Sequence, residues 1–235
     1  MKKGVNIRIN KILFLILLII YMIPSLARIR MLLSAALADA HFEFRKAQYI
    51  KSLTLLKDYG YNNVYIVEAL KKHGPTFLDD YSKHVFYSTV NNPHLRNNGI
   101  NEARTLLEGT YYFKFNPEDM IIKLTGRHHF ISDSFVQLVK NNFNYDALVK
   151  VDAKGDVYTV GFAMRCKYFR EMYEQMDYDA MECYRINLEH EVGNYIKRKV
   201  QKGNFNVLYV DKLDILANNF GSTTAPGAPE NIILF

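Results

Sequence analysis

Short apolar runs alternate with helical patterns along residues 31–235. Runs of strand length predict strands at residues 31–37, 63–67, 84–88, 120–125, 145–151, 157–164 and 205–210. Apolar residues at helical spacing predict helices at residues 42–59, 100–108, 134–142, 167–175 and 179–199. Residues 71–82 suit a loop or a short helix. Because strands and helices alternate early and a turn joins two late strands into a hairpin, we expect one α/β domain with a mixed, mostly parallel sheet.

One of these strands passes directly into polar groups. Residues 120–125 are largely apolar but include Lys123, and Gly126 follows them. The next three residues are Arg127, His128 and His129. In open α/β folds, a strand followed by a turn and a helix start places ligand-binding groups at the carboxyl end of that strand. The sequence therefore points to a site here, and it requires a partner for Lys123, since an unpaired buried charge is costly.

The first 30 residues change the meaning of the net charge, which is +6 for the 235-residue chain. They hold six of the 30 basic residues and no acidic one, so the other 205 residues balance at 24 basic and 24 acidic side chains. Basic residues that flank an apolar segment indicate membrane topology rather than nucleic-acid binding. We expect no nucleic-acid partner, and we divide the chain into residues 1–30, a domain at 31–215 and a tail at 216–235.

The predicted membrane contact is made by residues 12–27. The unbroken apolar part, residues 12–23, lies between the length of a full span and that of a signal-peptide core. We favour an uncleaved single-pass anchor with its N-terminus in the cytoplasm, because the stronger basic flank precedes the run. The alternative is secretion after cleavage near Ala27.

No metal-binding motif is evident in the sequence. Cys166 and Cys183 show no zinc-ligand spacing, and we expect both to be small buried hydrophobic residues. The acidic pair Asp79 and Asp80 lies between the second and third predicted strands, where a helix start or a solvated loop is expected.

Several segments together resemble a known family. N-N-G-I-N-E-A-R-T-L-L-E-G at residues 97–109, which includes Gly99 and Glu102, precedes the strand that carries K-L-T-G-R at residues 123–127. G-F-A-M-R-C-K-Y-F follows at residues 161–169, and I-N-L-E-H-E-V at residues 186–192. These segments resemble GT-A glycosyltransferases, particularly the inverting enzymes of the processive and capsule type, over most of residues 31–215. The K-L-T-G-R motif is similar to one in glycosyltransferase-like proteins of polysaccharide loci and large viruses. It replaces the Asp-x-Asp metal motif of the family.

The resemblance implies a single GT-A-like, Rossmann-like domain that moves a sugar from a nucleotide-diphosphate donor to a glycan acceptor. The donor-binding candidates are Lys123, Thr125, Arg127, His128, Asn98, Asn101 and Arg45. Lys123 and Arg127 would neutralise the departing diphosphate in place of a metal. No cofactor is implied beyond the donor, and a divalent metal is an alternative that no motif supports.

The resemblance also implies a general base that deprotonates the acceptor hydroxyl. Glu189 is the first candidate, and Glu191 and His190 are alternatives. Glu189 and Glu191 are two residues apart on a helix, so only one of them can face the site. Asp177 and Glu182 are outside candidates. Arg165 and Phe162 are expected on the acceptor side.

Each candidate also has a structural interpretation. Lys123 could pair with Asp119, and Arg127 with Asp133, while Arg45 and the acidic candidates could be solvated helix residues. Residues 218–224 are either a lid over the donor or an ordinary chain terminus. The rival functions are a non-catalytic nucleotide- or glycan-binding module on the same fold, and a different nucleotide-dependent transferase.

Overall fold

The computed structural model describes residues 28–38, 42–71, 74–218 and 232–235. The predicted membrane segment at 12–27, with the cleavage alternative at Ala27, lies outside these ranges, as do residues 219–224 of the predicted lid. None of the helices within the described ranges combines the length and the apolar character that crossing a bilayer requires.

A seven-stranded sheet of order β3-β2-β1-β4-β7-β6-β8 forms the centre of the fold. Its strands are β1 (Ile29–Ala35), β2 (Val64–Glu68), β3 (Val85–Tyr87), β4 (Met120–Thr125), β6 (Ala147–Val149), β7 (Gly161–Arg165) and β8 (Val207–Tyr209). β7 runs antiparallel to β4 and β6, and the remaining strand pairs of this sheet are parallel. The predicted α/β class with a mixed, mostly parallel sheet is confirmed, and β6 and β7 form the antiparallel pair that the late turn signal predicted.

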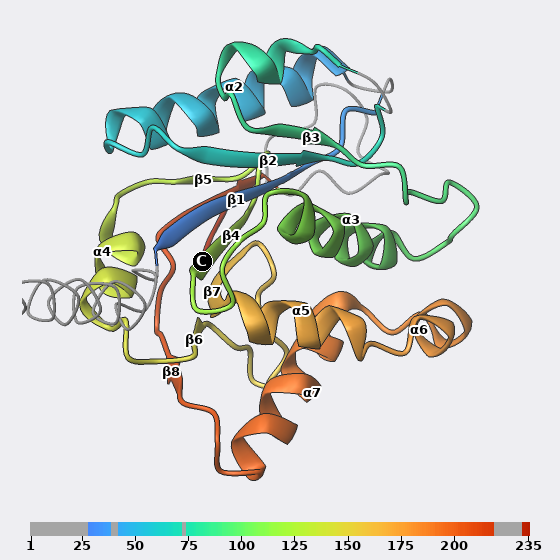
Figure 1. The fold of residues 1–235 in the computed structure, drawn as a ribbon, viewed down its shortest axis with the longest axis vertical. Coiled ribbons are helices and arrows are strands. Elements are labelled where there is room, and N and C mark those ends of the chain that lie inside the picture. Colours follow the sequence, from blue (N-terminus) through green and yellow to red (C-terminus); the bar gives the residue numbers. More distant parts are fainter. Residues whose placement is uncertain (1–27, 39–41, 72–73, 219–231) are drawn as a thin grey trace, which may run out of the picture.

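Helices cover both faces of the sheet (Figure 1). α2 (Phe42–Asp58) and α4 (Ser134–Asn141) pack on one face, and α3 (Asn98–Tyr112), α5 (Cys166–Glu174) and α7 (Leu188–Gln201) pack on the other. The alternation along β4 explains this arrangement. Met120, Ile122 and Leu124 join the core with α2, while Ile121 joins the core with α3. Because successive side chains of a strand point to opposite faces, Lys123 points to the α3 side.

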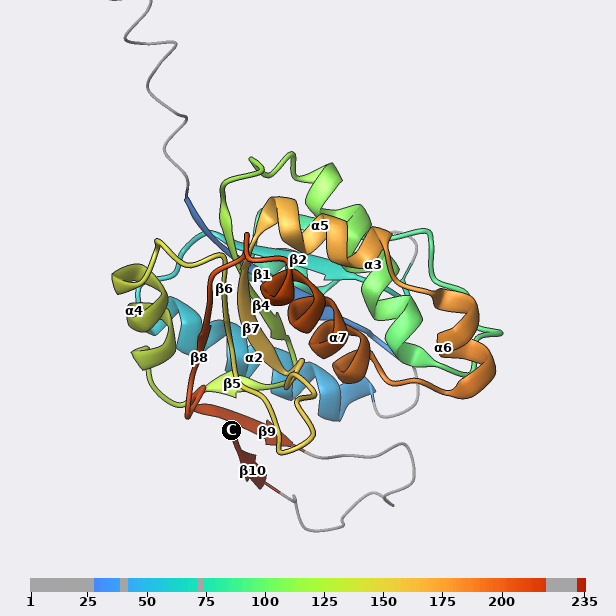
Figure 2. The ribbon, with the colours of Figure 1, turned by 90° about the horizontal axis from the view of Figure 1, so that it is seen from below.

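A smaller antiparallel sheet contains β5 (His129–Phe130), β9 (Ile215–Asn218) and β10 (Ile232–Leu234) in the order β10-β9-β5. Figure 2 shows β9 and β10 beside β5, close to the C-terminus. We assigned residues 216–235 to a tail and predicted no strand after residue 210, and this is wrong for β9 and β10. The Asn-, Gly-, Pro- and Thr-rich composition of the tail masked two short apolar runs that pair with each other.

The first strand begins two residues earlier than predicted, at Ile29. The backbone N–H of Arg28 donates to Asp119 Oδ1 at 2.8 Å, and Arg30 Nε donates to Asp119 Oδ2 at the same distance. The predicted boundary after residue 30 therefore falls inside β1. Arg28 and Arg30, which we assigned to the flank of the membrane segment, belong to the folded domain.

The predicted helix at residues 179–199 is wrong, because two helices occupy this range. α6 (Tyr178–Tyr184) ends at Arg185, whose left-handed backbone has a φ of 55°. α7 then starts after Asn187, whose side chain accepts a hydrogen bond from the backbone N–H of His190 at 2.8 Å. Asn187 is thus a helix N-cap.

The predicted helix at residues 100–108 is too short, because α3 does not end before Gly109 but continues to Tyr112. Gly109 is needed for packing instead. A Cβ atom at this position would lie 2.3 Å from Val67 Cγ2, so the glycine allows α3 to lie directly against β2.

Candidate functional site

A cleft of about 370 Å³ opens where β1 and β4 end, and we call it the arginine cleft. Its lining includes Ala36, Arg45, Tyr49, Asn98, Asn101, Glu102, Thr125 and Arg127. The strand order reverses here, because β2 and β3 lie on one side of β1 whereas β4 and the later strands lie on the other. In open α/β sheets, ligands bind outside the carboxyl ends of the strands at such a switch point.

Two arginines present positive charge to this cleft. Arg45 Nη1 donates to the carbonyl oxygen of Ala36 at 3.1 Å, which holds the side chain against the end of β1. Arg127 is half-buried and forms no hydrogen bond or ion pair with any other described residue. A guanidinium group matches two phosphate oxygens at once. The pair therefore suits an anionic ligand such as a diphosphate.

Gly126 and Tyr49 determine where Arg127 lies. A Cβ atom at Gly126 would lie 2.9 Å from Tyr49 Cε1 and 3.1 Å from the carbonyl oxygen of Ser34, so a larger residue would displace the turn. The Tyr49 hydroxyl accepts a hydrogen bond from the backbone N–H of Ala36 at 2.9 Å. Burial raises the pKa of Tyr49 to about 12, although that hydrogen bond and the charge of Arg127 oppose it. Tyr49 is thus a neutral wall of the cleft.

Lys123 lies beneath the arginine cleft, with a fully buried side chain. Its Nζ atom forms an ion pair with Glu102 Oε1 at 2.7 Å, and it donates to Thr125 Oγ1 at 2.8 Å and to the carbonyl oxygen of Thr159. These three acceptors use all three donors of the ammonium group. Lys123 therefore has the interior ion pair of our structural interpretation, with Glu102 in place of Asp119, and a direct contact with a ligand would require breaking one of these bonds.

Glu102 stays ionised because of this arrangement. Burial alone would raise the pKa of its carboxyl group, but the charge and the hydrogen bond of Lys123, together with Ser34 and the charge of Arg127, outweigh burial. A hydrogen bond from Ser34 Oγ, 2.8 Å long, acts in the same direction. The pKa of Glu102 consequently lies below its ordinary value, and the Lys123–Glu102 pair is neutral as a unit.

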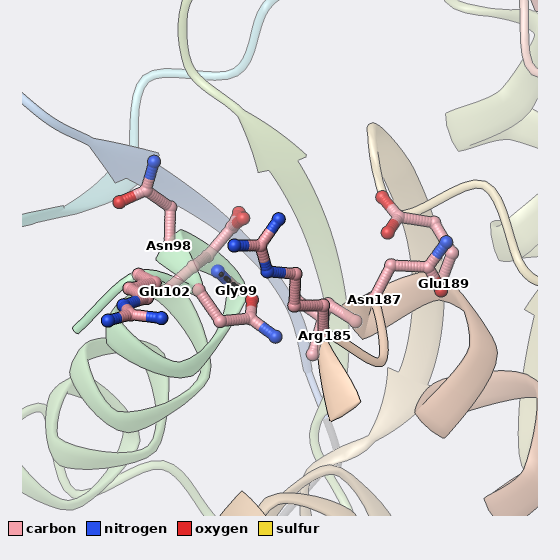
Figure 3. A pocket seen from close by; sticks show the side chains of 9 residues that line it. Asn98, Gly99, Glu102, Arg185, Asn187 and Glu189 are labelled. Carbon is pink, nitrogen blue, oxygen red and sulfur yellow. Dashed lines mark hydrogen bonds between the residues drawn. The ribbon is translucent and has the colours of Figure 1, made fainter. Parts of the chain in front are cut away.

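A second cavity, of about 590 Å³, adjoins the arginine cleft, and we call it the Glu189 cavity. It is lined by Arg96, Asn97, Asn98, Gly99, Glu102, Arg185, Asn187, Leu188 and Glu189. Figure 3 shows Glu102 and Arg185 extending into the space between α3 and Glu189. Asn98 and Glu102 line both cavities. Ligands in the two cavities would therefore meet beside these two residues.

Glu189 is held in place by Thr159. Thr159 Oγ1 donates to Glu189 Oε1, while the carbonyl oxygen of the same residue accepts from Lys123 Nζ. One buried threonine thus connects the Lys123–Glu102 pair to Glu189. Glu189 also lies in the first turn of α7, where the helix dipole favours a negative charge.

The other candidate bases do not line the two cavities, and some of them bind backbone groups instead. His190 and Glu191 do not line either cavity, and His190 Nδ1 lies 2.9 Å from Asp156 Oδ1. Asp177 caps α6. Glu182 accepts hydrogen bonds from the backbone N–H groups of Arg96 and Asn97, at 3.0 and 3.1 Å. Glu189 is thus the candidate base that the structure brings to a cavity.

Three further donor-binding candidates have defined places. Asn98 is the first residue of α3. Asn101 exchanges two 2.9 Å hydrogen bonds with the backbone of Asn92 and so holds the loop that precedes α3. His128 is buried next to the cleft residues. Burial, together with the charges of Arg127 and Lys123, lowers its pKa to about 3, so this imidazole is neutral at physiological pH.

The two residues expected on the acceptor side do not lie at either cavity. Phe162 is fully buried in the core opposite Lys123 in the β4–β7 register. Arg165 lies opposite Met120, at the other end of β4, where it donates to the backbone carbonyls of Glu118 and Phe143. β7 is antiparallel to β4, so its last residues reach the wrong edge of the sheet.

No metal centre is formed by the described residues, because none of their His, Cys, Asp and Glu side chains gather in groups of three or more that could hold an ion. Asp79 belongs to the capping box of a short 3₁₀ helix (Phe77–Asp80), as the helix-start interpretation predicted. Cys166 is buried as expected, but Cys183 is exposed, which contradicts our prediction.

Four residues of the site had no signal in the sequence. Arg96 and Arg185 lie in loops before α3 and α7, Ser34 lies near the end of the apolar strand β1, and Thr159 precedes β7. None of them belongs to a recognisable motif. Only the fold brings Arg96, Arg185 and Ser34 to the two cavities and Thr159 to Glu189 and Lys123.

Comparison with known proteins adds no family to this description. No family model matches the chain, and no curated protein shows significant similarity to it. The geometry of the two adjoining cavities therefore carries the functional argument.

Proposed function

We propose that this protein is a GT-A-like glycosyltransferase that moves a sugar from a nucleotide-diphosphate donor to a glycan acceptor. One observation carries the proposal. A cleft with two arginines at the switch point of the sheet adjoins a cavity that contains an oriented carboxylate, Glu189. The first feature suits the diphosphate of the donor, and the second suits the deprotonation of an acceptor hydroxyl.

The proposed reaction uses the two cavities together. The acceptor oxygen forms a bond to the anomeric carbon of the donor while the bond from that carbon to the diphosphate breaks. The bonding electron pair leaves with the nucleoside diphosphate, whose charge Arg127 and Arg45 stabilise. The hydroxyl proton of the acceptor passes to Glu189. Fixed cations that stabilise a leaving group electrostatically make one of the strongest contributions to enzymatic rate enhancement.

Lys123 has an indirect role in this proposal. All its donors are bound inside the protein, so it positions Glu102, Thr125 and Thr159 instead of contacting the donor. The two arginines are then the side chains that neutralise the diphosphate. This mechanism requires no metal ion.

The second candidate function is a non-catalytic nucleotide- or glycan-binding module. The neutral Lys123–Glu102 pair favours it, because this pair withdraws one of the two cations that the K-L-T-G-R motif offers for catalysis. A module of this kind would keep the binding role of Arg127 and would not need Glu189.

Nucleotide sugars separate the two candidates. We would incubate the full-length protein with uridine-, guanosine-, cytidine- and thymidine-diphosphate sugars and a panel of oligosaccharide acceptors, and follow binding and nucleotide release. The transferase releases nucleotide only when donor and acceptor are both present, with and without chelator. Donor binding without release on any acceptor supports the module. Complete loss of activity in chelator would contradict the metal-free mechanism.

A matched pair of variants tests the base. Glu189→Gln keeps the shape of the side chain but cannot take a proton, so we expect unchanged donor binding and a fall in transfer of about 10²-fold or more. Glu191→Gln removes the same charge two residues away and should retain transfer. Full activity in the Glu189 variant would exclude this residue as the base.

A further inference from the structure

We propose that the Glu189 cavity selects acceptor glycans that carry an anionic group, a carboxylate or a phosphate, and that Arg96 and Arg185 bind this group. The inference rests on the proposed function in one respect, because the ligand is taken to be the acceptor. The binding chemistry itself follows from the cavity.

The two arginines have their donor groups free. The side chains of Arg96 and Arg185 line the cavity, and neither forms a hydrogen bond or an ion pair with another described residue. Outside the lining, the charges of both arginines lower the pKa of Glu182, after the backbone hydrogen bond from Arg96. Its carboxylate oxygens already accept the backbone N–H groups of Arg96 and Asn97. The guanidinium N–H groups therefore remain available for an anionic ligand.

Neither of the two acids that line the cavity, Glu102 and Glu189, forms an ion pair with these arginines. The charge of Glu102 is matched by Lys123 at 2.7 Å. Glu189 accepts a hydrogen bond from Thr159 and lies in the first turn of α7. The lining residues alone hold two positive and two negative charges, and Lys123 offsets the charge of Glu102. An anionic ligand would therefore meet two arginines that have no ion-pair partner among the described residues.

Two helix N-termini meet at the floor of the cavity. A Cβ atom at Gly99, in the first turn of α3, would lie 3.0 Å from the Cβ of Leu188, the first residue of α7. Asn97, the N-cap of α3, donates to the carbonyl oxygen of Ile186 at 2.7 Å. The positive ends of the two helix dipoles are thus held together, and both add to the attraction of the arginines for an anion.

The backbone at Arg185 gives independent support. Its φ of 55° is a left-handed conformation, which glycine and asparagine adopt more easily than arginine. The turn that separates α6 from α7 requires this backbone conformation but not the guanidinium group of Arg185. Strained backbone at a cavity wall is typical of functional positions, and here the strained residue is the one whose side chain extends into the cavity (Figure 3).

Three matched trisaccharides test the proposal by direct binding. They are identical except for a terminal residue, which is glucose, glucuronate or glucose 6-phosphate. Calorimetric titration of the full-length protein should give at least tenfold tighter binding for one or both charged forms than for the neutral form. The two charged forms distinguish a carboxylate from a phosphate. Equal binding of all three trisaccharides would overturn the proposal.

Variants test whether Arg96 and Arg185 are the side chains that bind the anionic group. Arg185→Asn keeps a residue that tolerates the left-handed backbone, and Arg96→Gln is exposed and conservative. Each variant should lower the ratio of charged-trisaccharide affinity to neutral-trisaccharide affinity about tenfold. Lys202→Gln, which removes one exposed positive charge at the other end of α7, should leave the preference unchanged. A preference that survives both arginine variants would place the anion elsewhere and overturn the assignment.

The outcomes separate this inference from the proposed function. Charge-selective binding that is lost in the arginine variants, without sugar transfer from any donor, would keep the anion site and refute the transferase. Sugar transfer to neutral and charged acceptors with equal efficiency would keep the transferase and refute the anion site.

Discussion

Arginines at the two ends of β4 differ in what binds them. Where β4 begins, Arg30 is bound by Asp119 and by the hydroxyl of Tyr65. Arg165 and Arg170 at this end both donate to backbone carbonyl groups. Each of these three guanidinium groups ties together segments that are distant in the sequence.

Where β4 ends, the arginines are largely without partners. The side chains of Arg127, Arg96 and Arg185 form no hydrogen bond or ion pair with another residue of the described ranges, and that of Arg45 makes one hydrogen bond. Polar groups that belong to the architecture of a protein are normally paired within it. The first group of arginines therefore holds the fold together, whereas the second group is available to a ligand.

Loss of the buried Lys123–Glu102 ion pair, which lies between the two groups of arginines, should have the largest effect on stability. Lys123→Met leaves Glu102 without its cation, and we expect the free energy of unfolding to fall by about 3 kcal/mol. The double variant Lys123→Met/Glu102→Leu should recover most of this loss, because no charge remains unpaired. Urea unfolding measures both. A loss below about 1 kcal/mol in the single variant would show that the pair is not essential.

Removal of a paired arginine should cost somewhat less. Arg30→Met deprives Asp119, which is 1% exposed, of its ion pair, and we expect a loss of about 2 kcal/mol in urea unfolding. The loss is smaller than for Lys123 because backbone N–H groups still bind the carboxylate of Asp119. Unchanged stability would remove the distinction between the two groups of arginines.

The pH dependence of stability tests the burial of His128, beside the unpaired Arg127. Burial lowers the pKa of His128 to about 3, so below pH 6.5 the unfolded chain binds a proton at this imidazole and the folded chain does not. The contribution of neutral His128 to the free energy of unfolding is therefore fully present above pH 6.5. It falls as the pH drops toward 3, by about 2 kcal/mol between pH 6.5 and 5. His128→Phe should reduce the slope of stability against pH by about 1 kcal/mol per pH unit in this window. An unchanged slope would mean that His128 is not held neutral.

The smallest effect on stability is expected for an unpaired arginine. Arg127→Gln breaks no ion pair or hydrogen bond among the described residues, so the free energy of unfolding should stay within about 0.5 kcal/mol of the wild type. A loss as large as that of Arg30→Met would show that Arg127 is a structural residue after all.

The sequence could predict this site only in part. The strand at residues 120–125, its glycine turn and Arg127 were visible because apolar periodicity and glycine are local signals. Arg127 and Arg165 looked alike, since each follows an apolar strand. Their difference arises because β7 runs antiparallel to β4, and this direction depends on long-range pairing that no local pattern encodes.

The same limit explains the other corrections. Arg185 breaks a predicted helix although its sequence neighbours contain no glycine or proline. Gly109 looked like a helix end but serves the close approach of α3 to β2. Lys123 was predicted to need a partner, and it has one, but the choice of Glu102 over Asp119 follows from the face of β4 that α3 covers.

The ligand role of the arginine cleft is tested most directly by nucleoside diphosphate binding to wild-type protein and to Arg127→Gln. Titrations would use uridine, guanosine, cytidine and thymidine diphosphates, with the matching nucleosides as controls and Lys202→Gln as the charge-matched variant. For the nucleotide that binds best, we expect Arg127→Gln to weaken diphosphate binding at least tenfold, with no change for the nucleoside. Equal diphosphate affinity in the wild type and Arg127→Gln would contradict the assignment of this cleft to the donor.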